Sequence, residues 1–162
     1  MRSLSRNTVL ALIGVTLVLH SAEEYWTFPH FLSSATQLPR WLPPPRLFQH
    51  SRDIQVALVI VTVIALAIIS WAILSPRKGP LILALLIESI LLMNAGWHIL
   101  ASFARGGYAP GVITAVLINL PFGVYVLRRA VKEQWIRAQA AWRLLGIAVA
   151  FHFILLGTLL AG

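Results

Sequence analysis

A histidine and two glutamates lie within five residues near the start of the chain, at His20, Glu23 and Glu24. On a helix, residues three and four apart lie on one face, so the His20 imidazole would face both carboxyl groups. Imidazole and carboxylate are ligands of zinc, iron and manganese. Without a metal, the same groups could act as catalytic acid and base, with one orienting the other. The motif therefore predicts a divalent-metal site or an acid–base site.

A second polar pair, Asn94 and His98, is also spaced by one helical turn. His98 would supply a second imidazole, so the predicted metal ligands are His20, Glu23, Glu24 and His98, with Asn94 in support. Two imidazoles and one carboxylate leave a coordination position open, and a water bound there becomes acidic enough to react near neutral pH. The remaining glutamate would then act as general base or hold a ligand in place.

Further ionisable residues are less clearly assigned. Glu88 lies in an apolar run and has to be neutral or paired, with His152 or Asn119 as candidate partners. His152 is either a core histidine with one hydrogen bond or a supporting member of the site. His50 and Asp53 precede or begin an apolar stretch, and are additional candidates for the same level of the protein.

The elements that position these residues are predicted from composition. The 162 residues are 59% hydrophobic and 11% charged, and the mean hydropathy is +0.82. Soluble domains carry about 25% charged residues, so the surrounding solvent is predicted to be lipid. Without cysteine, disulfides and thiolate chemistry are excluded. The basic residues lie at the ends of apolar runs and form no single patch, which argues against nucleic acid as a partner.

Five apolar stretches of roughly 20 residues predict an all-α, polytopic bundle of five transmembrane helices forming one domain. The predicted spans are 7–26, 54–74, 80–103, 108–127 and 141–161. Nine of the thirteen Lys and Arg residues fall on the side of the N-terminus, which places that end in the cytoplasm and the site in the outer half of a bacterial inner membrane. The first stretch resembles a signal peptide, but His20 fits a cleavage site poorly, so we expect it to be retained.

The connecting segments carry their own predictions. Residues 27–53 contain five prolines and several aromatic residues, which predicts an interfacial loop that either covers the site or anchors in the headgroups. Residues 128–143 lack Gly and Pro and are predicted to extend the fourth helix along the cytoplasmic surface. Gly106–Gly111 is predicted to be a tight turn, and Pro121 to kink the fourth helix.

Several motifs, taken in order, resemble one family. They are His20-x-x-Glu23-Glu24, Asn94-x-x-x-His98, Tyr108-x-Pro110-Gly111-x-x-Thr114, and Pro121 before a basic helix end. Over residues 8 to 130 the chain is similar to the HXXEE family of small bacterial membrane proteins, whose biochemical role is unassigned. The resemblance implies a site at His20, Glu23, Glu24, Asn94 and His98. Tyr108, Pro110, Gly111 and Thr114 correspond to motif positions without a known role.

Three functions fit these features. The first is a membrane-embedded enzyme, either a hydrolase, an isomerase or a cyclase, that acts on a lipidic or membrane-soluble small molecule from the surrounding lipid. The second is a proton or metal transporter with a polar path through Glu88, Asn119 and His152. The third is a non-catalytic subunit whose polar residues join helices. Because ionisable groups inside a membrane are usually functional, we favour the enzyme.

Overall fold

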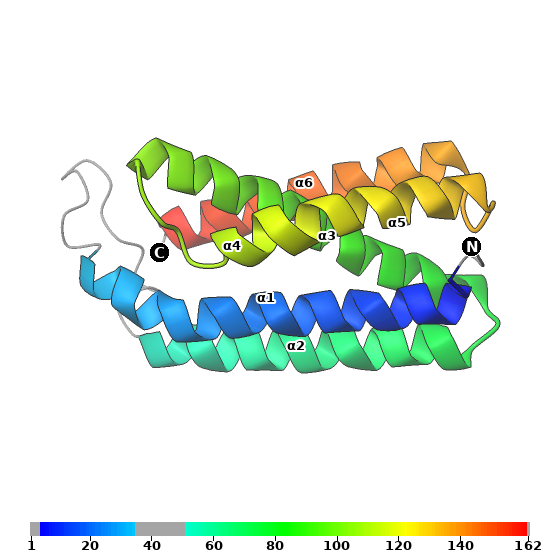
Figure 1. Ribbon diagram of the computed structural model, residues 1–162, viewed down its shortest axis with the longest axis horizontal. Helices are drawn as coiled ribbons and strands as arrows, with labels where there is room; N and C mark the ends of the chain where they lie inside the picture. Colours follow the sequence, from blue (N-terminus) through cyan, green and yellow to red (C-terminus); the bar gives the residue numbers. More distant parts are fainter. Residues whose placement is uncertain (1–3, 35–50, 162) are drawn as a thin grey trace.

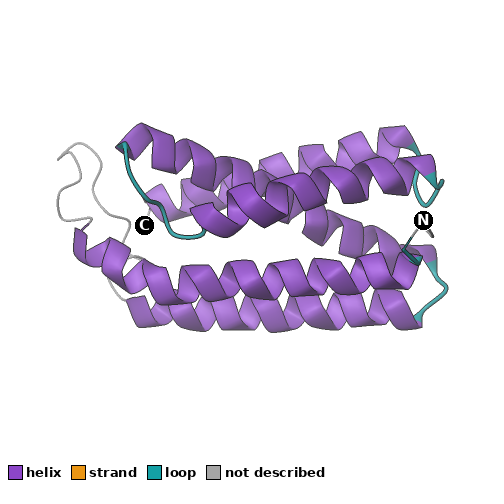
Figure 2. Ribbon diagram, viewed as in Figure 1, coloured by secondary structure: helices purple, strands orange, loops and turns teal. Residues whose placement is uncertain are grey.

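The computed structural model describes residues 4–34 and 51–161. In this part of the chain all regular structure is helical (Figure 2). The elements are α1 (Arg6–Ser34), α2 (Ser51–Leu74), α3 (Lys78–Arg105), α4 (Val112–Thr114), the π-helix η3 (Ala115–Asn119), α5 (Leu120–Lys132) and α6 (Ala138–Ala161). α4, η3 and α5 follow one another without interruption and form one continuous membrane segment.

The segments run up and down through one bundle (Figure 1). α1 and α2 lie side by side, and α5 and α6 lie on the other side of the bundle. α3 packs against α1, α2, α5, η3 and α6. It is therefore the central helix, and any polar residue on it can face several neighbours.

Five segments are long and apolar enough to cross a membrane: Arg6–Phe31, Arg52–Leu74, Lys78–Ala104, Val112–Lys132 and Ala138–Leu155. Large hydrophobic residues are exposed along all of them; on α2, Val61 and Val63 are examples. A water-soluble protein would not expose so much contiguous apolar surface. The chain is a multi-pass membrane protein with an all-α fold, as predicted.

Inside the bundle, the helices are joined by apolar packing and by hydrogen bonds between side chains. On α1, Val9, Leu10, Ile13 and Leu17 are buried, recur at helical spacing and belong to a hydrophobic core shared with residues of α2, α3 and α5. α1 and α2 are joined near their middle by a hydrogen bond from the Thr62 hydroxyl to Ser21 Oγ, at 2.8 Å. Such hydrogen bonds are suited to membrane helices, because lipid provides no hydrophobic force between apolar faces.

The predicted loop over residues 27–53 is wrong at both ends, because 27–34 and 51–53 are helical. α1 continues through Pro29, which lacks an N–H group and so leaves the carbonyl of Tyr25 without its helical donor. The side chain of Gln55 on α2 donates to that carbonyl at 3.0 Å. The neighbouring helix thus replaces the hydrogen bond that proline removes. The remainder of the predicted loop, residues 35–50, lies outside the described residues.

The fourth span begins at Val112, four residues later than predicted, because Tyr108–Gly111 belong to the preceding turn. Pro121 is the second residue after η3. In the π-helix the N–H of Leu120 donates to the carbonyl of Ala115, five residues back instead of four. The backbone hydrogen-bond pattern therefore shifts by one residue just before the proline. The predicted disturbance at Pro121 therefore takes the form of a π-helix.

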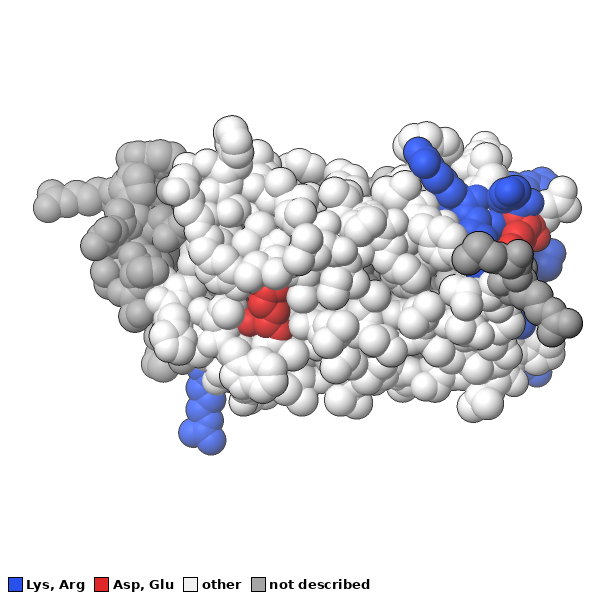
Figure 3. All heavy atoms as spheres, in the orientation of Figure 1, with Lys and Arg blue, Asp and Glu red and all other residues white. Residues whose placement is uncertain are grey.

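The predicted helical extension over residues 128–143 is wrong, because α5 ends at Lys132 and a turn precedes α6 at Ala138. Gln134 adopts a left-handed conformation in this turn, with φ of 58°. Arg129 holds the region together: it donates to Glu133 at 2.8 Å, to the Tyr125 hydroxyl at 2.7 Å and to the carbonyl of Leu4. Most basic atoms on the face drawn in Figure 3 gather at this end.

Candidate functional site

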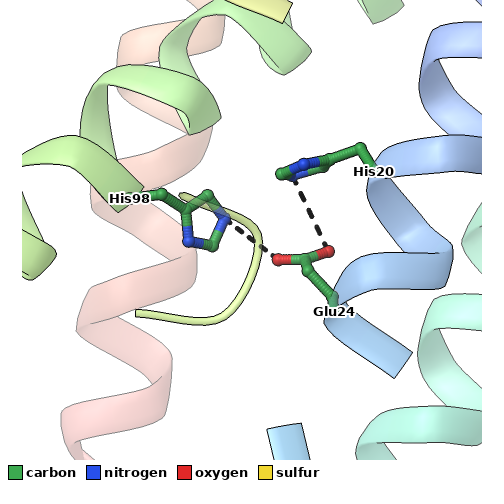
Figure 4. A group of neighbouring side chains, drawn as sticks. All are labelled: His20, Glu24 and His98. Carbon is green, nitrogen blue, oxygen red and sulfur yellow. Dashed lines mark ion pairs between the residues drawn. The ribbon is translucent and has the colours of Figure 1, made fainter. Parts of the chain in front are cut away.

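Two histidines and one glutamate converge between α1 and α3. One ligand atom from each of His20, Glu24 and His98 lies within 4.8 Å of the others. Glu24 Oε1 is 3.0 Å from His98 Nε2, and Glu24 Oε2 is 3.9 Å from His20 Nε2 (Figure 4). Only 1% of His20 and 9% of His98 is exposed. We call His20, Glu24 and His98 the triad; it brings His98 to two residues of α1 that lie 74 and 78 positions earlier in the sequence.

Asn94 connects the two imidazoles of the triad. Its amide Nδ2 donates to His20 Nε2 at 2.8 Å and lies 3.0 Å from His98 Nε2. His98 Nε2 also lies 3.0 Å from Glu24 Oε1, which only accepts, so the tautomer of His98 decides whether that nitrogen pairs with the amide or with the carboxylate. Nε2 of both rings faces one point, and the ring centroids are 5.1 Å apart in an edge-to-face arrangement. A metal ion at that point would meet the Glu24 carboxylate and, after displacing the Asn94 amide, both Nε2 atoms.

The second nitrogen of His20 lies at the start of a chain of hydrogen bonds. His20 Nδ1 is 2.7 Å from Thr114 Oγ1, which in turn lies 2.6 Å from Glu23 Oε2. A carboxylate only accepts and a hydroxyl has one hydrogen, so Thr114 donates to Glu23 and His20 Nδ1–H donates to Thr114. This order of donors fixes the tautomer of His20 with Nε2 free. Metal-binding histidines are oriented in the same way by an acceptor at their other nitrogen.

Glu23 does not belong to the triad, contrary to the prediction that it is a metal ligand. Its carboxylate also accepts from the Tyr108 hydroxyl at 2.7 Å and from the backbone N–H groups of Ile113 and Thr114, at 3.1 and 2.7 Å. These amides begin the fourth span, where helix N–H groups lack partners and favour an anion. Glu23 therefore fastens the start of α4 to α1 and supports His20 through Thr114.

Tyr108 lies in the turn outside the membrane-spanning segments. Burial raises the pKa of its phenol, and the neighbouring Glu23 carboxylate raises that pKa as well. The hydroxyl thus keeps its proton at neutral pH and can donate to Glu23. Through this hydrogen bond Tyr108, a motif position without a known role, supports the site.

Gly111 closes the site from the turn between α3 and α4. It has φ of 81°, a conformation that L side chains rarely adopt. A Cβ at this position would lie 2.8 Å from His20 Cε1, 3.1 Å from Glu24 Cγ and 3.3 Å from His98 Cε1. The glycine backbone therefore packs against all three members of the triad, and glycine is required there for both conformation and space.

The other predicted residues are placed as follows. His152 Nε2 is 3.4 Å from Asn94 Oδ1 and its Nδ1 is 2.9 Å from the carbonyl of Ala148, so it lies beside the triad without joining it. Glu88 is buried on α3 without a hydrogen bond to His152 or Asn119. Asp53 is exposed in the first turn of α2, and His50 lies outside the described residues.

Two residues of the site were given no role by sequence reasoning. Thr114 was a motif position without a known role, and Gly111 was expected only as part of the tight turn Gly106–Gly111. The sequence held one signal that could have assigned both residues to the site. They belong to the series Tyr108-x-Pro110-Gly111-x-x-Thr114, which follows the two histidine motifs in order.

The chain is similar to one protein family over most of its length. A family model described as a protein of unknown function with HXXEE motif matches residues 11–126. The chain belongs to this family. No curated protein and no solved structure gives a significant match. In this HXXEE protein, the motif that names the family contributes His20 and Glu24 to the triad, while its first glutamate, Glu23, lies in the supporting network.

The donor set of this HXXEE protein suits a divalent transition metal. Two imidazole nitrogens and one carboxylate oxygen are borderline ligands of the kind that zinc, iron and manganese accept. His20 and His98 are buried, Glu24 is partly buried, and Thr114 fixes the orientation of the His20 ring. Within the described residues this is the one group of three or more His, Asp and Glu side chains with suitable spacing.

Proposed function

We propose that this protein is a membrane-embedded enzyme that binds a divalent metal through His20, Glu24 and His98 and acts on a lipidic substrate. The observation that carries the proposal is the convergence of a ligand atom from each of His20, Glu24 and His98 within 4.8 Å, in a largely buried position. The charge bias along the chain supports a bacterial inner membrane, with the triad in its outer half. Hydrolysis, isomerisation and cyclisation are all compatible with the donor set.

The chemistry can be divided between the ion and the chain. A zinc, iron or manganese ion would supply a Lewis acid and acidify a bound water. The chain's own residues do the rest: Glu24 and the two imidazoles hold the site, and the Thr114–Glu23 pair keeps the proton of His20 on Nδ1. Asn94 lies close to both Nε2 atoms, so its amide N–H groups would become free to orient a polar group of the substrate once an ion takes those two nitrogens.

An apolar groove beside the triad supports a lipidic substrate. It lies between α3 and α6, has a volume of about 210 Å³ and is lined by Met93, Gly96, Trp97, Leu100, Val149, His152 and Phe153. Trp97, Leu100 and Phe153 are exposed on membrane-spanning segments, so the groove opens towards lipid rather than water. His152 is its polar residue and faces Asn94. A hydrocarbon chain in the groove would bring an attached polar group towards the triad.

The first experiment measures metal content. The protein would be purified in detergent, with an affinity tag that contains no histidine and without chelator, and analysed by elemental mass spectrometry. We expect close to one equivalent of zinc, iron or manganese, lost in the double variant His20→Ala, Glu24→Gln. The control His30→Ala removes an exposed imidazole outside the triad and should retain the metal. Equal, low metal in all three samples, each eluting as a folded protein, would refute the metal site.

A further inference from the structure

Deeper in the bundle, a second pair of buried polar side chains lies outside the triad and its supporting residues. Glu88 on α3 and Asn119 at the end of η3 are each 1% exposed. Glu88 Oε2 and both polar atoms of the Asn119 side chain are buried and make no hydrogen bond with the protein. By contrast, the neighbouring Ser89 donates its hydroxyl to the carbonyl of Leu85 at 2.8 Å. Buried polar atoms nearly always have a hydrogen-bond partner, so these three atoms of Glu88 and Asn119 call for one.

α3 packs against η3 and α5, so Glu88 and Asn119 both lie at the interface between α3 and the fourth span. A Cβ on Gly123 would lie 3.0 Å from Glu88 Oε1 and 3.2 Å from the Cβ of Leu92. Glu88 therefore points at the backbone of α5, where the absence of a side chain leaves room for its carboxyl group. Asn119 precedes Gly123 by four residues, about one helical turn, and so lies on the same face. The π-helix that ends at Asn119 helps set this direction.

The chemistry of the two groups restricts what can satisfy them. No basic side chain forms an ion pair with Glu88 among the described residues, so an anionic carboxylate here would be uncompensated at membrane depth. A neutral carboxylic acid has one donor and an acceptor, and an amide has both kinds of atom. Water, which donates and accepts, can bridge such groups when the site is polar and offers several partners.

We propose that Glu88 and Asn119 form a buried water-binding site in the membrane interior, in which Glu88 is held as a neutral carboxylic acid. Its O–H donates to a water molecule, and that water donates to Asn119 Oδ1. The site lies six residues below Asn94 along α3, roughly 9 Å by helical rise. It is thus a proton-holding group at a deeper level than the triad, and it requires neither a metal nor a substrate.

Infrared spectroscopy of the full-length protein in lipid nanodiscs at neutral pH tests this proposal. With five acidic residues in the chain, the carbonyl stretch of one protonated carboxyl group can be assigned by substitution. We expect such a band, lost in Glu88→Gln and shifted to higher frequency in Asn119→Leu. We also expect a water band that shifts in H₂¹⁸O and is lost in both variants. Ser89→Ala, a buried neighbour with a local hydrogen bond, is the matched control and should leave both bands unchanged.

Three results would overturn the proposal. The first is the absence of any protonated carboxyl band that Glu88→Gln removes, because Glu88 would then be ionised. The second is a Glu88 band that Asn119→Leu does not shift, because the two residues would then not share a site. The third is the absence of an ¹⁸O-sensitive water band that depends on both residues. Size-exclusion elution and circular dichroism of each variant show whether a missing band reflects loss of the fold.

Discussion

Glu23 and Glu24 are adjacent on α1, yet their carboxylates have different partners. Glu24 Oε1 lies 3.0 Å from His98 Nε2 on α3. Glu23 accepts four hydrogen bonds, all from Tyr108, Ile113 and Thr114 in the turn and helix that follow α3. Neighbouring residues on a helix point about 100° apart, so one side chain faces the triad while the other reaches the start of the fourth span. The two glutamates should therefore respond differently to the same substitution.

Glu24→Gln and Glu23→Gln form a matched pair. Glu24→Gln removes the charged ligand and should abolish metal binding, with a small effect on unfolding. Glu23→Gln turns an acceptor of four hydrogen bonds into a group that also donates, and should lower stability by about 1–3 kcal/mol while metal still binds, more weakly. Thermal unfolding in detergent and metal content measure the two effects. Identical behaviour of the two variants in both measurements would contradict the division of roles.

Thr114→Val tests the hydrogen-bond chain from His20 to Glu23. Valine keeps the shape of threonine but cannot accept from His20 Nδ1 or donate to Glu23. Loss of such an orienting partner typically weakens metal binding 10–100-fold, and we expect about that change here. Competition against a chelator of known affinity gives the number. Thr114→Ser restores the hydroxyl and should bind within a few-fold of the parent protein; equal affinity of the Val and Ser variants would exclude the orienting role.

Comparing Gly111→Ala with Gly106→Ala distinguishes a steric collision with the triad from the cost of backbone strain alone. Both glycines have positive φ, 81° and 63°, so alanine costs about 1–2 kcal/mol at either position. A Cβ at Gly106 meets nothing within 4 Å, whereas at Gly111 it would collide with His20 and press on Glu24 and His98. We expect Gly106→Ala to lower stability and keep its metal, and Gly111→Ala to lose the metal. Retention of metal by Gly111→Ala, at parent affinity, would show that the turn does not pack on the triad as described.

Gly96→Leu tests the lipid groove between α3 and α6. A Cβ on Gly96 has open space around it, so leucine should fit and occupy the groove. In vesicles containing a phospholipid with a photoreactive acyl chain, we expect cross-links to Met93 and Val149 to fall several-fold. Gly146→Leu, on an exposed part of α6 outside the groove lining, is the control and should leave them unchanged. An equal yield in all three proteins would argue against an acyl chain in the groove.

The sequence was sufficient for the features that depend on local pattern. Each span is long and apolar, and His20 to Glu24 and Asn94 to His98 are one-turn spacings on a helix, so the spans and these pairings could be predicted. The division between Glu23 and Glu24 could not, because it depends on donors at 108–114 that fold back more than 80 positions later. The continuation of α1 through Pro29 likewise depends on Gln55, a residue from another helix.

The turn after Lys132 shows a different limit. Residues 128–143 contain no Gly or Pro, which favoured one continuous helix. Instead, Gln134 takes the left-handed conformation that a glycine usually provides, and the Trp135 N–H bonds back to the carbonyl of Ala130 at 2.8 Å. The Arg129 guanidinium lies 5.6 Å from the centre of the Trp135 ring. Tertiary contacts of Arg129 and Trp135 thus compensate for a turn that local propensity disfavours.

The separation of His20 from Thr114, 94 positions along the chain, has a consequence for biogenesis. During synthesis, α1 must enter the bilayer long before its partners on α3 and α4 exist, with His20, Glu23 and Glu24 unmatched. It has the lowest mean hydropathy of the five spans, 1.2, whereas α2 has the highest, 2.9. Since α2 packs along α1 and bonds to it at Ser21 and Tyr25, the nascent hairpin is the unit that can hold the polar helix in place until the fourth span arrives.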